Sequence, residues 1–496
     1  MSYKKWSRII GFLLCISLTL CFESMVLQVN AAEKQGGRII NVVYDDSGSM
    51  VKTDDGKTIP RWSQAKYSLE VFTAMLNEND KMNIYPMSYQ GSLGYTLSGK
   101  DKNRVKTVHD MNSSFSNTPF AAVQSAGQDL MNDSSGAEKW LVFLTDAEFD
   151  DGATPKTTVQ TTIDSYNARG IKVAYLAIGN DATVLDGDPA SGFYTEKASD
   201  GVDVLKKVTS IANQIFEHLV LPDDYISGSN GKTTLTFDIP TKQIIVFAQG
   251  DNVKISDMQS NGQQIKAAEI ENVKFSDVLP ENYPDAVVDN SLKGVVATFE
   301  SGNEPYSEGT FEISVTGAKT VEYYYSPGVV VNADLLYGDK PVNENAELYS
   351  GDYKVSMNFV NPLTGKKVES KLLSDAKFSL AVTNNGNKQV IDSDSGNMSL
   401  AEGDVELLAL AQLPGQVELS DKKDYVVLPE PISLGLKTDK ASYTYVANEI
   451  ADQTAECILT ATNEDSGELL SENEWNNTEI KVESDGGVEW KVEKGS

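Results

Sequence analysis

A short apolar segment that ends in a polar turn constrains this chain most. Residues 39–44 form a hydrophobic, β-branched run, which predicts a buried strand. The run stops at Asp45-x-Ser47-x-Ser49, so one carboxylate and two hydroxyls lie on a tight turn at the carboxyl end of that strand. Open α/β sheets bind their ligands at this edge. Because these groups are hard oxygen donors that suit Mg²⁺, Ca²⁺ or Mn²⁺, the segment predicts a cation site.

Two polar residues further along the chain extend this pattern. Thr118 precedes Pro119 and the helix-like stretch 120–131, and Asp146 follows the second apolar run, 140–145. Each also has a simpler interpretation, since Thr-Pro is a good helix start and an acid is common in a strand-ending turn. Taken in order and context, five positions resemble the metal-ion-dependent adhesion site of the von Willebrand factor A (vWA) domain family: Asp45, Ser47, Ser49, Thr118 and Asp146.

The resemblance to the vWA family implies how such a site works. The five side chains would hold one divalent cation, Mg²⁺ or else Mn²⁺ or Ca²⁺, and leave one coordination position open for a carboxylate of a partner protein. The chain departs from the family pattern after Asp146, where Ala147 replaces the usual glycine. An acidic rim follows, formed by Glu148, Asp150 and Asp151.

Strand-like and helix-like patterns alternate over residues 37–217, the predicted vWA domain. The apolar strand-like runs are 39–44, 82–87, 140–145 and 171–178. Between and after them, apolar residues recur at helical spacing, as in Ala65, Leu69 and Phe72. Such alternation predicts an α/β fold with a doubly wound, mostly parallel sheet of the vWA or Rossmann-like kind.

The pattern changes to period-two alternation after residue 217. A Pro-, Gly- and Ser-containing stretch at 218–232 is predicted as a linker. All-β, immunoglobulin-like sandwich domains are predicted at 233–330 and 331–430, because apolar alternation such as Leu235, Phe237 and Ile239 is interrupted by turn signals. The last segment, 431–496, is β-rich but short for a sandwich, so it is either incomplete or cut from a longer chain.

The amino-terminal end predicts export from the cell. Residues 1–31 combine a basic start, an apolar stretch and small residues at the end, which is typical of a signal peptide. After cleavage only Cys457 of the three cysteines remains, so no intrachain disulfide can form. A secreted or cell-surface protein without a disulfide framework is associated with bacteria, here a Gram-positive one. The formal net charge of −30 argues against nucleic acid and anionic membrane as partners.

Enzyme chemistry finds little support in the sequence. His109 and His218 are the two histidines, and neither lies in a motif with a nucleophile. Three hydroxyls and two acids would make a poor water-activating metal site, since metal hydrolases commit more carboxylate or His ligands to the ion. We therefore expect a secreted, metal-dependent adhesion or protein-binding module. The alternatives are a structural or assembly component of a bacterial envelope complex and a non-catalytic subunit of a larger enzyme.

Overall fold

The computed structural model describes residues 37–438, 457–463 and 469. Gaps within these ranges fall at 54, 113–119, 147–155, 180–181, 200, 230, 276–277, 338–339, 343–346, 415–416 and 430–431. The predicted signal peptide at 1–31 lies outside the described residues. The chain divides into two compact units: the first is Met1–Val331 with Phe359–Ala376 and Ala411–Ser420, and the second is Asn332–Asn358 with Lys377–Leu410 and Asp421–Ser496.

The first unit begins with a six-stranded sheet in the order β3-β2-β1-β4-β5-β6. Its strands are β1 (Ile39–Tyr44), β2 (Lys81–Pro86), β3 (Tyr95–Ser98), β4 (Lys139–Thr145), β5 (Lys172–Ile178) and β6 (Phe193–Ala198). All neighbours pair in parallel except β3, which runs antiparallel to β2 at the edge. The central strands are buried along nearly their whole length, which is why they read as continuous apolar runs in the sequence.

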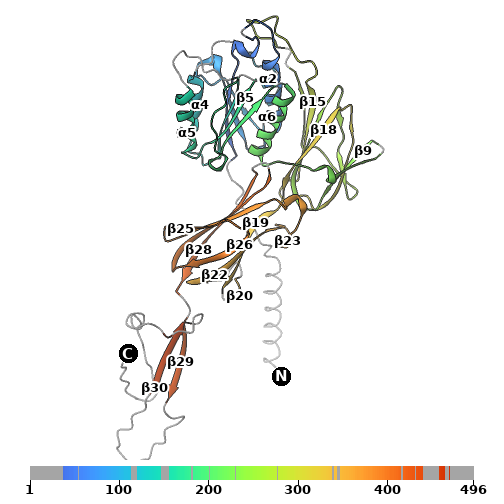
Figure 1. The fold of residues 1–496 in the computed structure, drawn as a ribbon. Helices are drawn as coiled ribbons and strands as arrows, with labels where there is room; N and C mark the ends of the chain where they lie inside the picture. Colours follow the sequence, from blue (N-terminus) through green and yellow to red (C-terminus); the bar gives the residue numbers. More distant parts are fainter. Residues whose placement is uncertain are drawn as a thin grey trace, which may run out of the picture. The chain divides into compact units, whose positions relative to one another are not determined.

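Helices cover both faces of this sheet (Figure 1). They are α2 (Arg61–Ala74), α3 (Arg104–His109), α4 (Ala121–Asn132), α5 (Lys156–Asn167) and α6 (Gly201–Phe216), with short 3₁₀ turns η1 (Gly48–Met50), η2 (Met87–Tyr89) and η3 (Pro189–Ser191). Helices α2 and α6 share a core with Ile40 and Val42, whereas α4 and α5 share one with Val43. The structure therefore has the mostly parallel sheet with helices that the sequence predicts, with one antiparallel edge.

A β domain made of antiparallel sheets completes most of the first unit. One five-stranded sheet has the order β14-β15-β10-β18-β7, and another has the order β13-β12-β16-β9-β8. The strands are β7 (Leu219–Val220), β8 (Ile226–Ser229), β9 (Lys232–Phe237), β10 (Thr241–Gln249), β11 (Lys254–Ile255), β12 (Met258–Ser260), β13 (Gln263–Ile265), β14 (Glu269–Lys274), β15 (Lys293–Glu300), β16 (Gly309–Ile313), β17 (Val315–Thr316) and β18 (Thr320–Pro327).

The stretch predicted as a linker, 218–232, contains strands of this β domain instead. β7 pairs with Tyr324 and Tyr325 of β18, and β8 pairs with β9. The Pro- and Asp-containing sequence between them forms the short turn η4 (Asp223–Tyr225). The chain passes from α6, which ends at Phe216, directly into β7, which begins at Leu219. Leu219 and Leu221 are buried, as expected for residues that pack in the domain and not in an exposed linker. Composition alone marked the turn but not the two short strands beside it.

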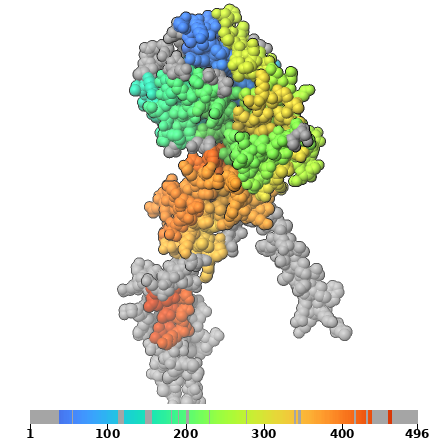
Figure 2. All heavy atoms as spheres, turned by 45° about the vertical axis from the view of Figure 1, so that its right-hand side comes forward, coloured from blue at the N-terminus to red at the C-terminus, as the bar shows by residue number. Residues whose placement is uncertain are grey.

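Helix α2 is buried between the parallel sheet and the β domain (Figure 1). Every residue from Trp62 to Ala74 is buried, so the helix has no solvent-facing side. One hydrophobic core joins Trp62 and Phe72 of α2 to Phe247 and Val296 of the β domain. In Figure 2 the blue surface of the early residues meets the yellow-green surface of the β domain without a break. We infer that these two parts unfold together.

Buried polar contacts add specificity to this packing. Arg104 of α3 is fully buried, and its Nη1 lies 2.6 Å from Oε1 of Glu269 and 3.7 Å from Oε1 of Glu271, both on β14. The backbone N–H of Lys274 donates to Oε2 of Glu70 on α2 at 3.2 Å. Burying charges is costly unless they are paired, so these contacts fix one arrangement of the two parts.

The buried imidazole of His218 predicts a loss of stability in mild acid. Its Nε2 lies 2.6 Å from Oε1 of Gln243, and burial lowers the pKa of His218 to about 3. An unfolded histidine titrates near 6.5, so below that pH the unfolded state binds the extra proton. The contribution of neutral His218 to the free energy of unfolding is complete above about pH 6.5. Below that pH it falls by about 1.4 kcal/mol per pH unit.

Urea unfolding at two pH values measures this effect. Between about pH 7.5 and 5.5, the wild type should lose roughly 1.4 kcal/mol more than His218→Gln, because the variant lacks the titrating ring. Comparing the two chains removes the contributions of the carboxylates, which both share. Equal losses in the two chains would contradict the assignment of a neutral, buried His218.

Residues 330–428 form two further five-stranded sheets, and a separate two-stranded ribbon follows. The strands are β19 (Val330–Tyr337), β20 (Lys340–Pro341), β21 (Leu348–Tyr349), β22 (Gly351–Val360), β23 (Lys367–Val368), β24 (Lys377–Asn384), β25 (Asn387–Ile391), β26 (Ser395–Leu400), β27 (Gly403–Gln412), β28 (Glu418–Leu428), β29 (Ile432–Thr438) and β30 (Cys457–Asn463), with a 3₁₀ turn η5 (Lys371–Leu373). Alternate residues of β22 and β27 are buried, as the period-two pattern predicts. Within the described residues, no helix has the length and apolar character needed to cross a membrane.

Candidate metal centre

The predicted metal-binding turn lies at the carboxyl end of β1. The backbone N–H of Asp45 donates to the carbonyl of Leu144 at 2.9 Å, so Asp45 continues the pairing of β1 with β4. The chain then enters η1, where the N–H of Met50 donates to the carbonyl of Ser47 at 3.2 Å. Because β1 and β4 are parallel neighbours, their ends bring Asp45 and Asp146 to the same edge of the sheet.

Hydrogen bonds join the side chains of this edge into one cluster. Oδ1 of Asp45 accepts from the N–H of Ser47 at 2.9 Å, and the hydroxyls of Ser47 and Ser49 lie 2.9 Å apart. The Ser49 hydroxyl donates to Oδ1 of Asp146 at 3.0 Å. Thr145 donates its hydroxyl to Oδ2 of Asp45 at 2.6 Å, which fixes that carboxylate. The structure thus brings four of the predicted ligands together.

The other predicted parts of the site lie outside the described residues. Thr118 falls in the gap at 113–119, and the acidic rim of Glu148, Asp150 and Asp151 falls in the gap at 147–155. Both gaps adjoin described elements of the parallel sheet region, since α4 begins at Ala121 and β4 ends at Thr145. Their part in the site stays a prediction from the sequence.

Two carboxylates are buried close together in this cluster. Asp45 is fully buried and Asp146 is 8% exposed. Burial, and after it the negative charge of Asp45, raise the pKa of Asp146 to about 7, although Ser49 and Arg61 act in the opposite direction. The cluster therefore holds two buried acids whose negative charge the surrounding groups compensate incompletely. A divalent cation is the kind of ligand that such a cluster favours.

A third buried acid, Asp46, fixes the turn to the neighbouring strand. Its carboxylate accepts from the backbone N–H of Ser88 at 2.8 Å and from the hydroxyl of the same residue. Burial raises the pKa of Asp46 to about 6, although both hydrogen bonds from Ser88 act in the opposite direction. Asp46 is thus engaged with η2 at the end of β2, and it holds the turn in place.

Three residues of this cluster were not predicted from the sequence. Asp46 and Thr145 directly adjoin predicted ligands, so their position in the motif was a signal that could have found them. Arg61 is different, because no motif includes it. Its Nη1 lies 3.3 Å from Oδ2 of Asp146, and its side chain is 19% exposed.

A loop of the β domain lies against the turn that contains Ser47 and Ser49. This β14–β15 loop, of which 275 and 278–292 are described, places Tyr283 so that a Cβ added to Gly48 would lie 2.9 Å from its hydroxyl. Nζ of Lys52 lies 3.1 Å from Oδ2 of Asp285 and 5.3 Å from the centre of the Tyr283 ring. The rim beside the turn is therefore built by both parts of the first unit, and Tyr283 closely approaches position 48.

The donor set fits a hard cation. Within the described part of the chain, no group of three or more His, Cys, Asp and Glu side chains could hold a metal ion. A cation at this edge would instead meet the hydroxyls of Ser47 and Ser49 beside the carboxylates of Asp45 and Asp146. Oxygen donors of this kind suit Mg²⁺, Mn²⁺ and Ca²⁺ and do not suit softer metals.

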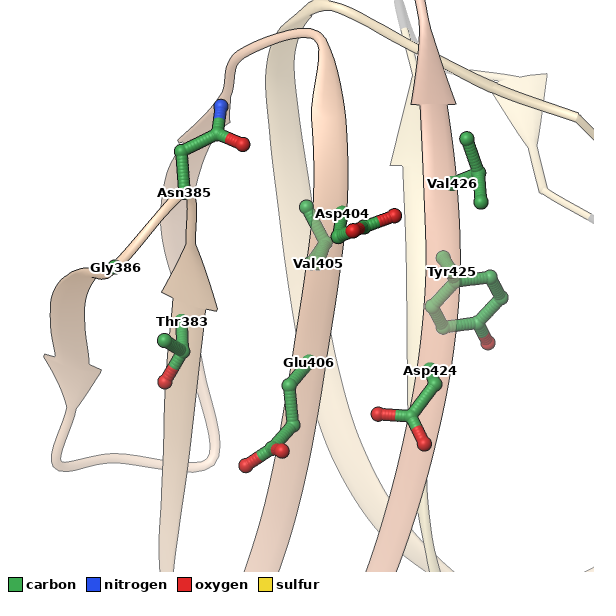
Figure 3. Close-up of a pocket in the computed structure, with 9 residues that line it drawn as sticks. All are labelled: Thr383, Asn385, Gly386, Asp404, Val405, Glu406, Asp424, Tyr425 and Val426. Carbon is green, nitrogen blue, oxygen red and sulfur yellow. The ribbon is translucent and has the colours of Figure 1, made fainter.

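Apart from this cluster, a concave site lies on the sheet of β24, β27 and β28 (Figure 3). Its volume is about 590 Å³, and three carboxylates line it: Asp404, Glu406 and Asp424. Nζ of Lys422 lies 2.7 Å from Oε2 of Glu406 and 3.7 Å from Oδ1 of Asp424, so part of this charge is already paired. These are surface contacts of low energy, and they indicate no particular ligand.

Comparison with solved structures finds low similarity to a pilus adhesin and to vWA domains. The pilus adhesin SpaC from Lactobacillus rhamnosus GG is 11% identical, with a TM-score of 0.32, over 86% of this chain and 64% of the adhesin. The ArnB paralog VWA2 from Sulfolobus acidocaldarius is 12% identical, with a TM-score of 0.25, over 74% of this chain and 67% of that protein.

Manganese-loaded TRAP protein from Plasmodium vivax is also similar, at 14% identity and a TM-score of 0.23, over 35% of this chain and 72% of that one. The match with the adhesin SpaC covers 64% of that protein, so this chain spans less than two thirds of the length of SpaC. No family model matches the sequence. A search of curated proteins likewise finds no match. Likeness at these scores does not assign the chain to a family.

Proposed function

We propose that this chain is a metal-dependent binding protein that captures a protein partner through a carboxylate, with a vWA-type domain as its binding part. The observation that carries the proposal is the hydrogen-bonded cluster of Asp45, Ser47, Ser49 and Asp146 at the carboxyl edge of the parallel sheet. Thr118, which lies outside the described residues, is the fifth proposed ligand.

The residues of the cluster have distinct roles in this proposal. Ser47 and Ser49 supply neutral oxygens, and Asp45 and Asp146 supply the negative charge. A bound Mg²⁺, or Mn²⁺ or Ca²⁺ in its place, would act as a Lewis acid toward a carboxylate oxygen of the partner. Thr145 and Ser88 orient the neighbouring carboxylates of Asp45 and Asp46, so the donors are held in place before a ligand binds.

A binding role suits these side chains better than a catalytic one. Both histidines are buried in hydrogen bonds, His109 with Glu70 at 3.0 Å and His218 with Gln243 at 2.6 Å. The two acids of the cluster are already engaged, Asp45 with Ser47 and Thr145 and Asp146 with Ser49 and Arg61. We therefore propose a non-catalytic protein that acts outside the cell or at its surface.

Capture of a partner with and without the cation tests the proposed function. The immobilised chain should retain a surface protein from its source cells in Mg²⁺ and release it in EDTA. Thr118→Ala should reduce retention by about tenfold or more, because it removes a proposed ligand of the cation. The far-ultraviolet circular dichroism of the variant, which should match the wild type, controls for folding.

The structural alternative has one specific observation in its favour. Lys52 and Tyr283 link the metal-binding turn to the β14–β15 loop, so a cation could serve chiefly to hold the two parts together. In that case EDTA would lower the melting temperature and leave partner retention unchanged when measured well below it. Retention that is undiminished in EDTA would discard the adhesion mechanism.

A further inference from the structure

Arg61 engages the oxygen of Asp146 that the serine cluster does not use. Oδ1 of Asp146 accepts the hydroxyl of Ser49 at 3.0 Å, and Oδ2 lies 3.3 Å from Nη1 of Arg61. The Arg61 side chain is 19% exposed and that of Asp146 is 6% exposed. The pair is therefore largely shielded from water. An ion pair in such a position is screened less than one at the surface.

The backbone of Arg61 is held in place by the end of β1. Arg61 is the first residue of α2, and the next residue, Trp62, is buried with its carbonyl accepting the Tyr44 hydroxyl at 3.4 Å. Ser63 donates its hydroxyl to the carbonyl of Pro60 at 3.0 Å, which fixes the same turn. With its backbone fixed in this way, the guanidinium can leave Asp146 by rotation of the Arg61 side chain.

The helix itself does not favour a cation at this position. The N-terminal end of a helix carries a partial positive charge, which disfavours a basic residue there. The first turn of α2 contains no acidic residue, and no side chain caps it. The contact with Asp146 offsets this cost.

We propose that Arg61 is a counter-ion built into the metal site. Without a cation it neutralises Asp146, and a divalent cation must compete with it for that carboxylate. Once displaced, its guanidinium turns to the partner and donates hydrogen bonds to the carboxylate that the cation captures. The planar fork of arginine matches a carboxylate, which lysine does not. The inference rests on the proposed metal-dependent function.

Titration of the full chain with Mn²⁺ tests the first half of the inference. Arg61→Gln should bind Mn²⁺ about tenfold more tightly than the wild type, because a competing positive charge is removed. Lys57→Gln is the matched control, since it removes the same charge from an exposed site four residues earlier, and its affinity should stay within about twofold. The metal-free Arg61→Gln chain should also melt at a lower temperature than the wild type.

The outcomes separate this inference from the proposed function. If the wild type binds Mn²⁺ and Arg61→Gln binds it no more tightly, the counter-ion role is overturned and the metal site stands. If neither chain binds Mn²⁺, the assignment of the metal site is wrong, and the inference that depends on it is wrong as well. A higher Mn²⁺ affinity of Arg61→Gln, together with an unchanged Mn²⁺ affinity of Lys57→Gln, supports both.

Binding of an aspartate-containing peptide tests the second half of the inference, that Arg61 contacts the captured carboxylate. The same peptide with asparagine in place of aspartate is the negative control. In saturating Mn²⁺, Arg61→Gln should bind the aspartate peptide about tenfold more weakly than the wild type. The affinity of Arg61→Lys for this peptide should lie between the other two, since lysine keeps the positive charge and lacks the planar, two-pronged guanidinium group. Binding that is equal in the wild type and Arg61→Gln, or absent from both, would overturn the role in carboxylate capture.

Discussion

Saturating Mg²⁺ should raise the melting temperature of the first unit by about 5 °C. A ligand at about 100 times its dissociation constant adds roughly 2.7 kcal/mol to the state that it binds, and a domain of this size gains about two degrees per kcal/mol. The parallel sheet and the first β domain should shift together, because α2 and the core around Trp62 and Phe247 belong to both. Differential scanning calorimetry with and without Mg²⁺ measures the shift.

Two controls sharpen this result. Asp45→Ala should abolish the shift, since it removes one of the two buried carboxylates that the cation would neutralise. The transition of the second unit, which includes β24 and β27, should not move. Equal shifts in every transition, or a shift that persists in Asp45→Ala, would indicate general screening of an acidic chain instead of a site.

Arg104→Ala should lower the free energy of unfolding of the first unit by about 3 kcal/mol. Removing one partner of a buried ion pair leaves the other charge without compensation, which costs about 3–5 kcal/mol when both are buried. Here Glu269 and Glu271 are 29% and 17% exposed, which places the loss at the lower end. The variant also leaves the carbonyl of Thr73 without the Nε donor that lies 3.0 Å from it.

Lys106→Ala is the matched control for this variant. Lys106 lies on the same short helix, and its ion pair with Asp110 is solvent-exposed, with 71% of the Lys106 side chain accessible. Exposed pairs of this kind contribute about 0–1 kcal/mol. Urea unfolding of both variants should therefore separate them clearly. Similar small losses in both would contradict the role of Arg104 in joining α3 to β14.

Much of the fold could be predicted because its signals are local. The apolar run that predicts a strand at 39–44 coincides with β1, and the residues Ala65, Leu69 and Phe72, which recur at helical spacing, lie within α2. The short strands β7 and β8 were missed because two to four residues beside a Pro and a Gly carry no period. Strand pairing supplied what the local sequence did not.

The burial of α2 shows where sequence patterns stop being informative. An amphipathic helix has one apolar face, but α2 is buried all round and contains buried polar residues such as Lys66 and Glu70. Their partners lie far away in sequence, as Lys274 does from Glu70. Such contacts leave no periodic signal, so the sequence predicts the helix and not the β domain packed against it.

The candidate site divides in the same way. Asp45, Ser47, Ser49 and Asp146 were predictable because each follows an apolar strand whose end defines its place. Arg61 and Tyr283 were not, since one depends on where α2 begins and the other on a loop more than 200 residues away in sequence. Ligand type follows from residue chemistry, whereas the residues that surround the ligands follow from tertiary packing.

The most direct test of the central claim is the number of Mn²⁺ ions that the chain binds. Electron paramagnetic resonance counts free Mn²⁺, so titration of the full chain gives both stoichiometry and affinity. We predict one ion per chain in the wild type, displaced by Mg²⁺, and none at the same concentrations in Asp45→Ala. Absence of bound Mn²⁺ in the wild type, or equal binding by Asp45→Ala, would contradict the assignment of the metal site.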